Sequence, residues 1–132
     1  MFEDENKKIY NILISKGEND ENKEYQEFIS KLYSRDDFLW KETMIGSTDY
    51  SSIPKTFFKD VDVIILLSGL YKENKESLDS LVKIANEENI PLVMVRPLGL
   101  EEVPLELEEY SDGLVGWNAN CIIDTIKGTD VC

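Results

Sequence analysis

The chain has 132 residues, of which 42% are hydrophobic and 31% are charged, a composition typical of one soluble globular domain. Its 27 acidic and 14 basic residues give a net charge of −13, which repels a phosphate backbone and excludes nucleic acid as a partner. Histidine is absent, so catalysis by a Ser-His or Cys-His pair is excluded and no metal site is expected.

Nothing in the sequence suggests export or membrane insertion. The opening residues MFEDENKK are acidic, whereas a secretory signal needs a basic start and an apolar core. The apolar run from Val61 to Leu67 is broken by Asp62 and is too short to cross a membrane. We therefore expect a cytoplasmic protein, in which the two cysteines, Cys121 and Cys132, do not suggest a disulfide framework.

The first half of the chain predicts two strands and two helices. Ile9 to Ser15 is almost continuously apolar, as expected of a strand that is buried on both faces. A helix is expected from about Glu21 to Ser34, and Phe38 to Trp40 predicts a short second strand. Ser52 is a candidate cap for a short helix with Pro54 in its first turn. The longer helix is predicted by apolar side chains at helical spacing: Tyr25, Phe28, Ile29, Leu32 and Tyr33.

The middle of the chain repeats this alternation of strand and helix. Val61 to Leu67 predicts a third strand at the centre of the sheet, and Pro91 to Val95 predicts a fourth. Between them a helix is expected from about Lys75 to Glu88. Its apolar stripe consists of Leu78, Leu81, Val82 and Ala85.

The last third predicts a short strand and a final helix. Pro104 to Tyr110 is expected to form one or two helical turns, and Gly113 can adopt the positive φ that ends them. Leu114 to Val115 predicts the fifth strand. Asn118 is a candidate N-cap for a helix that Gly128 closes. The apolar face of this helix consists of Ile122, Ile123 and Ile126.

Five alternations of strand and helix predict a three-layer α/β domain. Right-handed crossovers give a parallel sheet with helices on both faces, and the flavodoxin-like strand order 2-1-3-4-5 is expected. The domain is assigned to residues 9–128, with a flexible lead-in at 1–8 and a tail at 129–132.

The carboxyl ends of the strands are the expected ligand site in such a sheet, near the switch point between the first and third strands. Small residues there allow close approach, aromatic rings can stack on a base, and arginine can pair with phosphate. The alternative is a structural role for each residue, with Arg96 paired to Glu101 or Glu102. The candidate ligand-binding residues are Ser15, Lys16, Gly17, Trp40, Lys41, Ser68, Gly69, Tyr71, Arg96, Gly99, Trp117 and Asn118.

Several functions of flavodoxin-like domains are excluded. A phosphoryl-accepting receiver needs an Asp at the end of the third strand and a Lys at the end of the fifth. The sequence has Leu67-Ser68 and Gly116-Trp117 at these places. The segment SKGENDEN puts acids where a flavin phosphate would bind, and neither a Walker A loop nor GxGxxG is present.

Over about Ile12 to Ile126 the chain resembles the bacterial TIR-like domains of the Thoeris anti-phage defence type. The resemblance is carried by ILISKG, FLWKETMI, DVIILLSGLY, VRPLG, and VP followed by VGWNANCIIDTI. It implies a TIR-like fold and a role in nucleotide signalling. Active members cleave NAD, release nicotinamide and in some cases form an ADP-ribose messenger.

That activity depends on one glutamate, on the helix after the third strand. The family pattern is a tyrosine, a short gap and Trp-x-x-x-Glu, and here Tyr71 matches while the tryptophan and glutamate positions fall on Ser77 and Leu81. Leucine can neither stabilise a cation nor transfer a proton. Glu76 is the best remaining candidate, and it requires the helix to begin late.

Two main hypotheses follow. The first is a binding or protein-interaction module without catalysis, which pairs with itself or with another TIR-like or effector subunit. The second is an NAD glycohydrolase or cyclase that uses a displaced carboxylate. A nucleoside deoxyribosyltransferase is a third hypothesis, which also needs a carboxylate in the cleft. No resident cofactor is expected, and NAD or ADP-ribose is the expected substrate or ligand.

Overall fold

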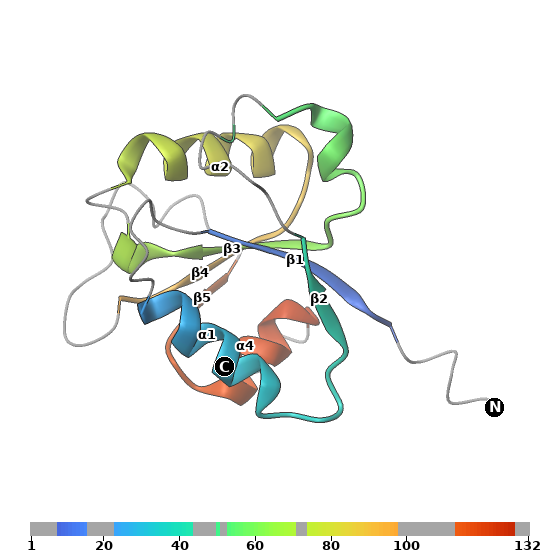
Figure 1. Cartoon of the computed structure of the whole chain (residues 1–132), viewed down its shortest axis with the longest axis vertical. Helices are drawn as coiled ribbons and strands as arrows, with labels where there is room; N and C mark the ends of the chain where they lie inside the picture. Colours follow the sequence, from blue (N-terminus) through green and yellow to red (C-terminus); the bar gives the residue numbers. More distant parts are fainter. Residues whose placement is uncertain are drawn as a thin grey trace.

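The fold is a parallel α/β sheet in the predicted strand order β2-β1-β3-β4-β5. The computed structural model describes residues 8–15, 23–43, 50, 53–70, 74–97 and 113–128. All four strand pairs in it are parallel (Figure 1). The elements are β1 (Tyr10–Ile14), α1 (Lys23–Tyr33), β2 (Trp40–Glu42), η3 (Lys55–Phe58), β3 (Val63–Leu67), η4 (Ser68–Leu70), α2 (Lys75–Glu87), β4 (Leu92–Val95), β5 (Gly113–Val115) and α4 (Ala119–Ile126).

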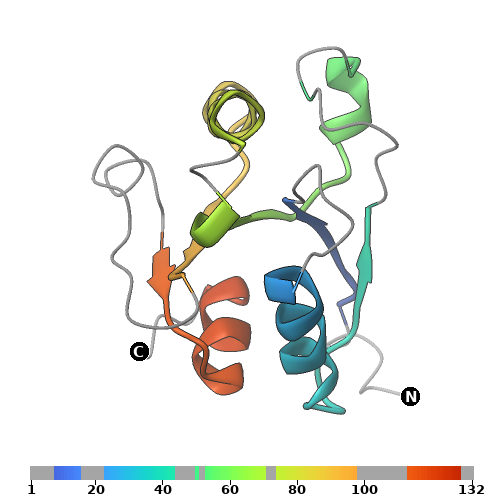
Figure 2. The ribbon, with the colours of Figure 1, turned by 60° about the vertical axis from the view of Figure 1, so that its left-hand side comes forward.

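Helices cover both faces of this sheet. α1 and α4 lie side by side on one face, and α2 lies on the other together with the short 3-10 helix η3 (Figure 2). The predicted three-layer flavodoxin-like architecture is thus confirmed.

The alternation of side chains along the strands divides the core in two. Leu13, Ile64 and Leu66 face α2. Ile12 and Ile14, like Ile65 and Leu67 of β3, face α1 and α4. Every residue of β3 and β4 is buried, which explains why these strands read as unbroken apolar runs.

The two longer helices differ in how much of the predicted apolar stripe they bury. In α1 only Phe28 and Leu32 are fully buried, while Tyr33 is 70% exposed. α2 buries its whole predicted stripe of Leu78, Leu81, Val82 and Ala85. The outer members of the α1 stripe extend beyond the sheet because β2, the strand beneath them, is the edge strand.

Asp62, which interrupts the central apolar run, joins the amino ends of β1 and β3. Its carboxylate accepts a hydrogen bond from the Asn11 N–H at 2.8 Å, and its own N–H donates to the Asn11 carbonyl at 2.8 Å. Lys8 lies 3.3 Å from the same carboxylate. A charged residue is therefore accommodated at a strand end, where it bonds to the backbone of the neighbouring strand.

The structure corrects several local predictions. Gly113 begins β5 rather than ending a turn, because it pairs with Val93 of β4. Pro54 precedes η3 as its N-cap residue with φ −57° and ψ 140°, an extended conformation, instead of lying in the first turn. The proposed cap Ser52 and the turns at 104–110 lie outside the described residues.

The structure also bears on the predictions made for the cysteines and for membrane insertion. Cys121, in the first turn of α4, is disulfide-bonded, which contradicts the expectation from compartment and composition. The sequence contains one other cysteine, Cys132, which lies outside the described residues. Within the described part of the chain, no helix is both long and apolar enough to cross a membrane.

Candidate functional site

The carboxyl ends of β1, β3 and β4 form the edge where the sequence placed most ligand-binding residues. Four of the predicted residues, Lys16, Gly17, Tyr71 and Gly99, lie outside the described residues. Those that the structure describes fall into two groups at different places on the sheet.

The two buried serines of the first group join neighbouring strands. Ser15 Oγ accepts a hydrogen bond from the Leu67 N–H at 2.9 Å, and Ser68 Oγ donates to the Val95 carbonyl at 2.7 Å. Both serines are at most 2% exposed. Their hydroxyls therefore align the carboxyl ends of β1, β3 and β4, and a ligand at this edge meets the backbone and not these oxygens.

Arg96, Trp117 and Asn118 occupy the β4–β5 side of the same edge. The Arg96 N–H donates to the Val115 carbonyl at 2.9 Å, and the Trp117 indole N–H donates to the Arg96 carbonyl at 2.8 Å. Asn118 caps α4, because its Oδ1 accepts from the Cys121 N–H at 3.1 Å, as the sequence predicted. The Arg96 side chain is exposed, so its guanidinium is accessible to an anion.

A carboxylate that was not among the predicted site residues also lies at this edge. Glu24, in the first turn of α1, packs its side chain against Gly69, which directly follows the buried Ser68. A Cβ placed on Gly69 would clash with Glu24 Oε1, so the carboxylate occupies the space that a side chain would need. Nothing in the sequence indicates this contact, because it depends on how α1 is placed over β3.

Trp40 and Lys41, the second group, lie elsewhere. They were expected at the carboxyl end of the second strand, but β2 begins at Trp40, which pairs with Tyr10 at the start of β1. Three strands separate β2 from β5, so Trp40 and Trp117 belong to opposite edges of the sheet, roughly 19 Å apart by strand spacing. They cannot line one compact site.

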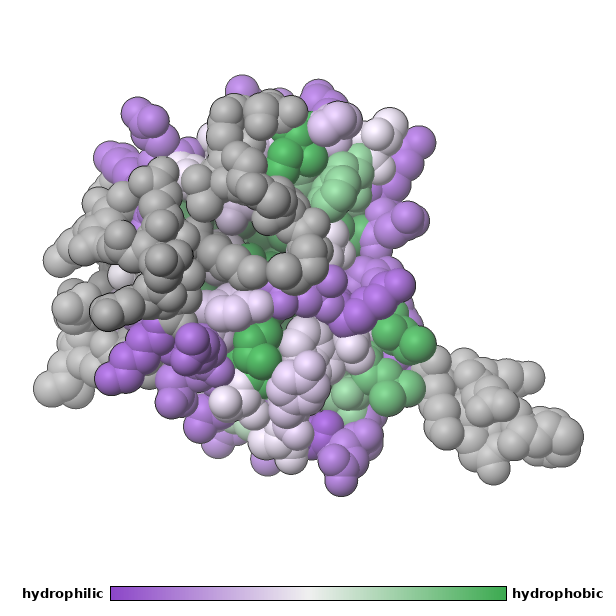
Figure 3. Space-filling view, in the orientation of Figure 1, coloured by the Kyte–Doolittle hydropathy of each residue, from purple (hydrophilic) through white to green (hydrophobic). Residues whose placement is uncertain are grey.

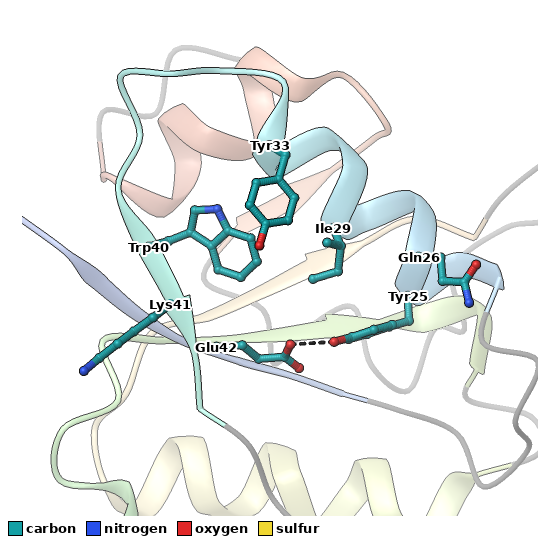
Figure 4. A pocket seen from close by; sticks show the side chains of 7 residues that line it. All are labelled: Tyr25, Gln26, Ile29, Tyr33, Trp40, Lys41 and Glu42. Carbon is teal, nitrogen blue, oxygen red and sulfur yellow. Dashed lines mark hydrogen bonds between the residues drawn. The ribbon is translucent and has the colours of Figure 1, made fainter.

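At the β2 edge these residues take part in a separate hollow of about 470 Å³ between α1 and β2 (Figure 4). Tyr33 and Trp40 form one wall, with ring centroids 5.1 Å apart and planes inclined at 52°. Figure 3 shows a small hydrophobic area between α1 and β2, one of several on this face of the molecule. The hollow, called the edge pocket below, is lined by Tyr25, Gln26, Ile29, Tyr33, Trp40, Lys41 and Glu42.

The polar end of the edge pocket is a tyrosine–carboxylate pair. The Tyr25 hydroxyl donates to Glu42 Oε1 at 2.5 Å. Burial, and then the hydrogen bond to Glu42, raise the pKa of Tyr25 well above its ordinary value of 10.0. Tyr25 is consequently a neutral donor at physiological pH, and it orients the carboxylate in the pocket.

Lys41 points the other way. Successive side chains of a strand alternate between its faces, so Trp40 and Glu42 share the α1 face and Lys41 lies on the opposite face. Figure 4 shows its side chain directed away from the rings. Lys41 also borders a second hollow, of about 860 Å³, between β2 and η3. The charged residues that line it include Lys59, Asp60 and Asp62.

Chemically, the two places offer different groups. Among the described residues no cluster of three or more Cys, Asp or Glu side chains could hold a metal ion. The carboxyl edge offers backbone, an exposed guanidinium and the Glu24 carboxylate, whereas the edge pocket offers aromatic rings and the Glu42 carboxylate. Comparison with protein-family models found no match for this chain, and comparison with curated proteins also found none.

Proposed function

We propose that this chain is a TIR-like nucleotide-signalling or defence protein of the cytoplasm that acts by binding, and does not cleave NAD. Its ligand in this proposal is NAD or ADP-ribose at the carboxyl ends of the strands, and its partner is a second copy or another TIR-like or effector subunit. The observation that carries the proposal is the burial of Leu81, which is 0% exposed.

Leu81 occupies the position that the resemblance assigns to the catalytic glutamate. It packs in the α2-side core with Leu78, Ile64 and Met94, among others. By helical geometry Glu76 is rotated by about 140° and Asp79 by about 160° from the direction of Leu81. Both are exposed, so neither reaches the place that a glutamate at position 81 would serve.

One observation favours the second candidate function, an NAD glycohydrolase or cyclase with a displaced carboxylate. Glu24 brings a carboxylate to Gly69 at the switch point between β1 and β3. A carboxylate at that place could accept hydrogen bonds from ribose hydroxyls and stabilise a cationic sugar as nicotinamide leaves. It is better placed for this than Glu76, whose side chain is exposed in the first turn of α2.

Nicotinamide release separates these candidates. The purified chain is incubated with NAD at high protein concentration, beside Glu24→Gln and Glu76→Gln. We expect no release above the buffer rate in any of the three. Sustained turnover by the wild type that either substitution abolishes would overturn the binding proposal and identify the carboxylate.

Binding is then measured by the thermal shift that ADP-ribose produces. We expect a shift of the wild-type midpoint that Arg96→Ala reduces, because an exposed guanidinium can pair with phosphate. Lys59→Ala, which removes an exposed cation from the other hollow, is the matched control and should leave the shift unchanged. A wild type with neither shift nor turnover would contradict both candidate functions.

A further inference from the structure

The edge pocket has the composition of a cage for a cation. Tyr25, Ile29 and Tyr33 recur every four residues of α1 and so line one side of the helix, which faces Trp40 and Glu42 of β2 (Figure 4). Three of these five side chains are aromatic and one is a carboxylate. Aromatic faces attract cations through their quadrupole, and they attract ammonium and guanidinium groups within about 6 Å of the ring centre.

The spacing of the groups suits one compact cation. Trp40 and Glu42 are two residues apart on one face of β2, which places their Cα atoms about 7 Å apart. A cation held between them lies within reach of both the indole ring and the carboxylate. Tyr33 extends the wall beside Trp40, since their centroids are 5.1 Å apart.

Charge selects against other ligands. Glu42 is the acidic residue in the pocket wall, and the Lys41 ammonium is directed to the opposite face of the strand. The chain as a whole carries a net charge of −13, so its field attracts cations and repels anions. A phosphate-bearing ligand is therefore disfavoured here, in contrast to the exposed Arg96 at the far side of the sheet.

We propose that the edge pocket binds a methylated ammonium group through the Tyr33 and Trp40 rings and the Glu42 carboxylate. A methylated ammonium fits better than a bare one, because its methyl groups contact rings and Ile29 while its charge needs few hydrogen bonds. The volume of about 470 Å³ is within the usual range for small-ligand pockets. This site is independent of the function proposed for the carboxyl edge.

The test uses choline and its neutral isostere 3,3-dimethylbutan-1-ol, titrated into the ¹⁵N-labelled full chain. The two tryptophans give separate indole N–H signals, and Trp117 serves as an internal control because it lies on the opposite edge, bonded to the Arg96 carbonyl. We expect choline to shift the Trp40 signal saturably, with a Kd on the order of 1 mM, and to leave Trp117 unchanged. The isostere should bind at least about fivefold more weakly.

Two variants identify the groups responsible. Glu42→Gln keeps an oxygen for the Tyr25 hydroxyl and removes only the charge, so it should weaken choline binding about five- to tenfold. Tyr33→Leu removes a ring that is 70% exposed, so the fold should persist while binding weakens severalfold. Phe57→Leu removes an exposed ring outside the pocket, so it should bind as the wild type does.

A further arm distinguishes the source of the cation. N-acetyl-trimethyllysine amide carries the same head group as a protein side chain would, and tighter binding of it than of choline indicates a methylated protein partner. The reverse order indicates a free small molecule. Equal binding of choline and the isostere, an unchanged Kd in Glu42→Gln, or no shift of Trp40 with either cation would overturn the proposal.

Discussion

The two serine side chains at the carboxyl ends of β1 and β3 are hydrogen-bonded to neighbouring strands, whereas the polar and aromatic side chains of the edge pocket face a hollow in the surface. Ser15 and Ser68 are buried and bridge strands. Tyr33, Trp40 and Glu42 remain partly or largely exposed. Polar and aromatic residues near strand ends therefore mark a ligand site only where the sheet leaves their side chains accessible.

The largest effect on stability is expected in the core beneath α2, at Leu81. The resemblance assigns the family's catalytic glutamate to this position. Leu81→Glu should destabilise the fold by about 3 kcal/mol or more, since it buries an unpaired charge and opens a gap in the core. Urea unfolding measures this loss. Asn86→Glu, which adds the same charge at an exposed position of α2, is the control.

If Leu81→Glu instead folded as stably as the wild type and released nicotinamide from NAD, position 81 would be open to the cleft. The contrast between the buried face of α2 and the accessible edge pocket would then be wrong.

An intermediate effect is expected for the serines that bridge strands. Ser68→Ala should cost about 1–3 kcal/mol of unfolding free energy, because the buried Val95 carbonyl loses its hydrogen-bond donor. Ser34→Ala removes an exposed hydroxyl that also donates to a carbonyl, that of Lys31, and should cost much less. Equal costs would show that burial does not determine how much a serine hydroxyl contributes to the free energy of unfolding.

The smallest effect is expected at Asp37, which follows α1 on the surface. Hydrogen bonds from the Arg35 guanidinium lower the pKa of Asp37 from its ordinary 3.8 to about 2. The folded state therefore gains stability from this carboxylate above about pH 4, and loses that gain as the pH falls toward about 2. Because the pair is exposed, the contribution to stability is small.

Carboxyl chemical shifts followed by NMR between pH 1 and 6 check this value. In Arg35→Gln the midpoint of Asp37 should return toward its ordinary range. An unchanged midpoint would assign the shift to another group, and would leave Arg35 with Asp124, 3.3 Å away, as its partner.

Much of the fold could be predicted from particular patterns. Continuous apolar runs such as Val63–Leu67 identified the buried strands, and the stripe of α2 predicted its buried face. Asn118 was identified as a cap because Asn has an oxygen that reaches the first-turn N–H groups. These features depend on neighbours within a few residues in the chain, which is why sequence periodicity revealed them.

The candidate sites were less accessible to sequence reasoning. Tyr25 and Tyr33 were read as part of a helical core stripe, because periodicity does not show where the sheet beneath a helix ends. Trp40 was placed at the end of the second strand instead of at its start, since a three-residue edge strand has too few positions to show its register. The contact between Glu24 and Gly69 joins segments that carry no signal for one another.

Composition and local patterning alone established an acidic α/β domain of alternating strands and helices, because burial on both faces and helical spacing leave a periodic pattern in the chain itself. The parallel order 2-1-3-4-5 was expected from the crossover rule and the flavodoxin-like arrangement, and the structure confirms it. The accessibility of the site residues arose only from packing. Contacts between distant segments buried Ser15 and Ser68, brought Glu24 to Gly69, and gathered Tyr25, Tyr33, Trp40 and Glu42 around one pocket. Such contacts join residues far apart in the chain and depend on how the helices pack on the sheet. They therefore leave no local pattern in the sequence.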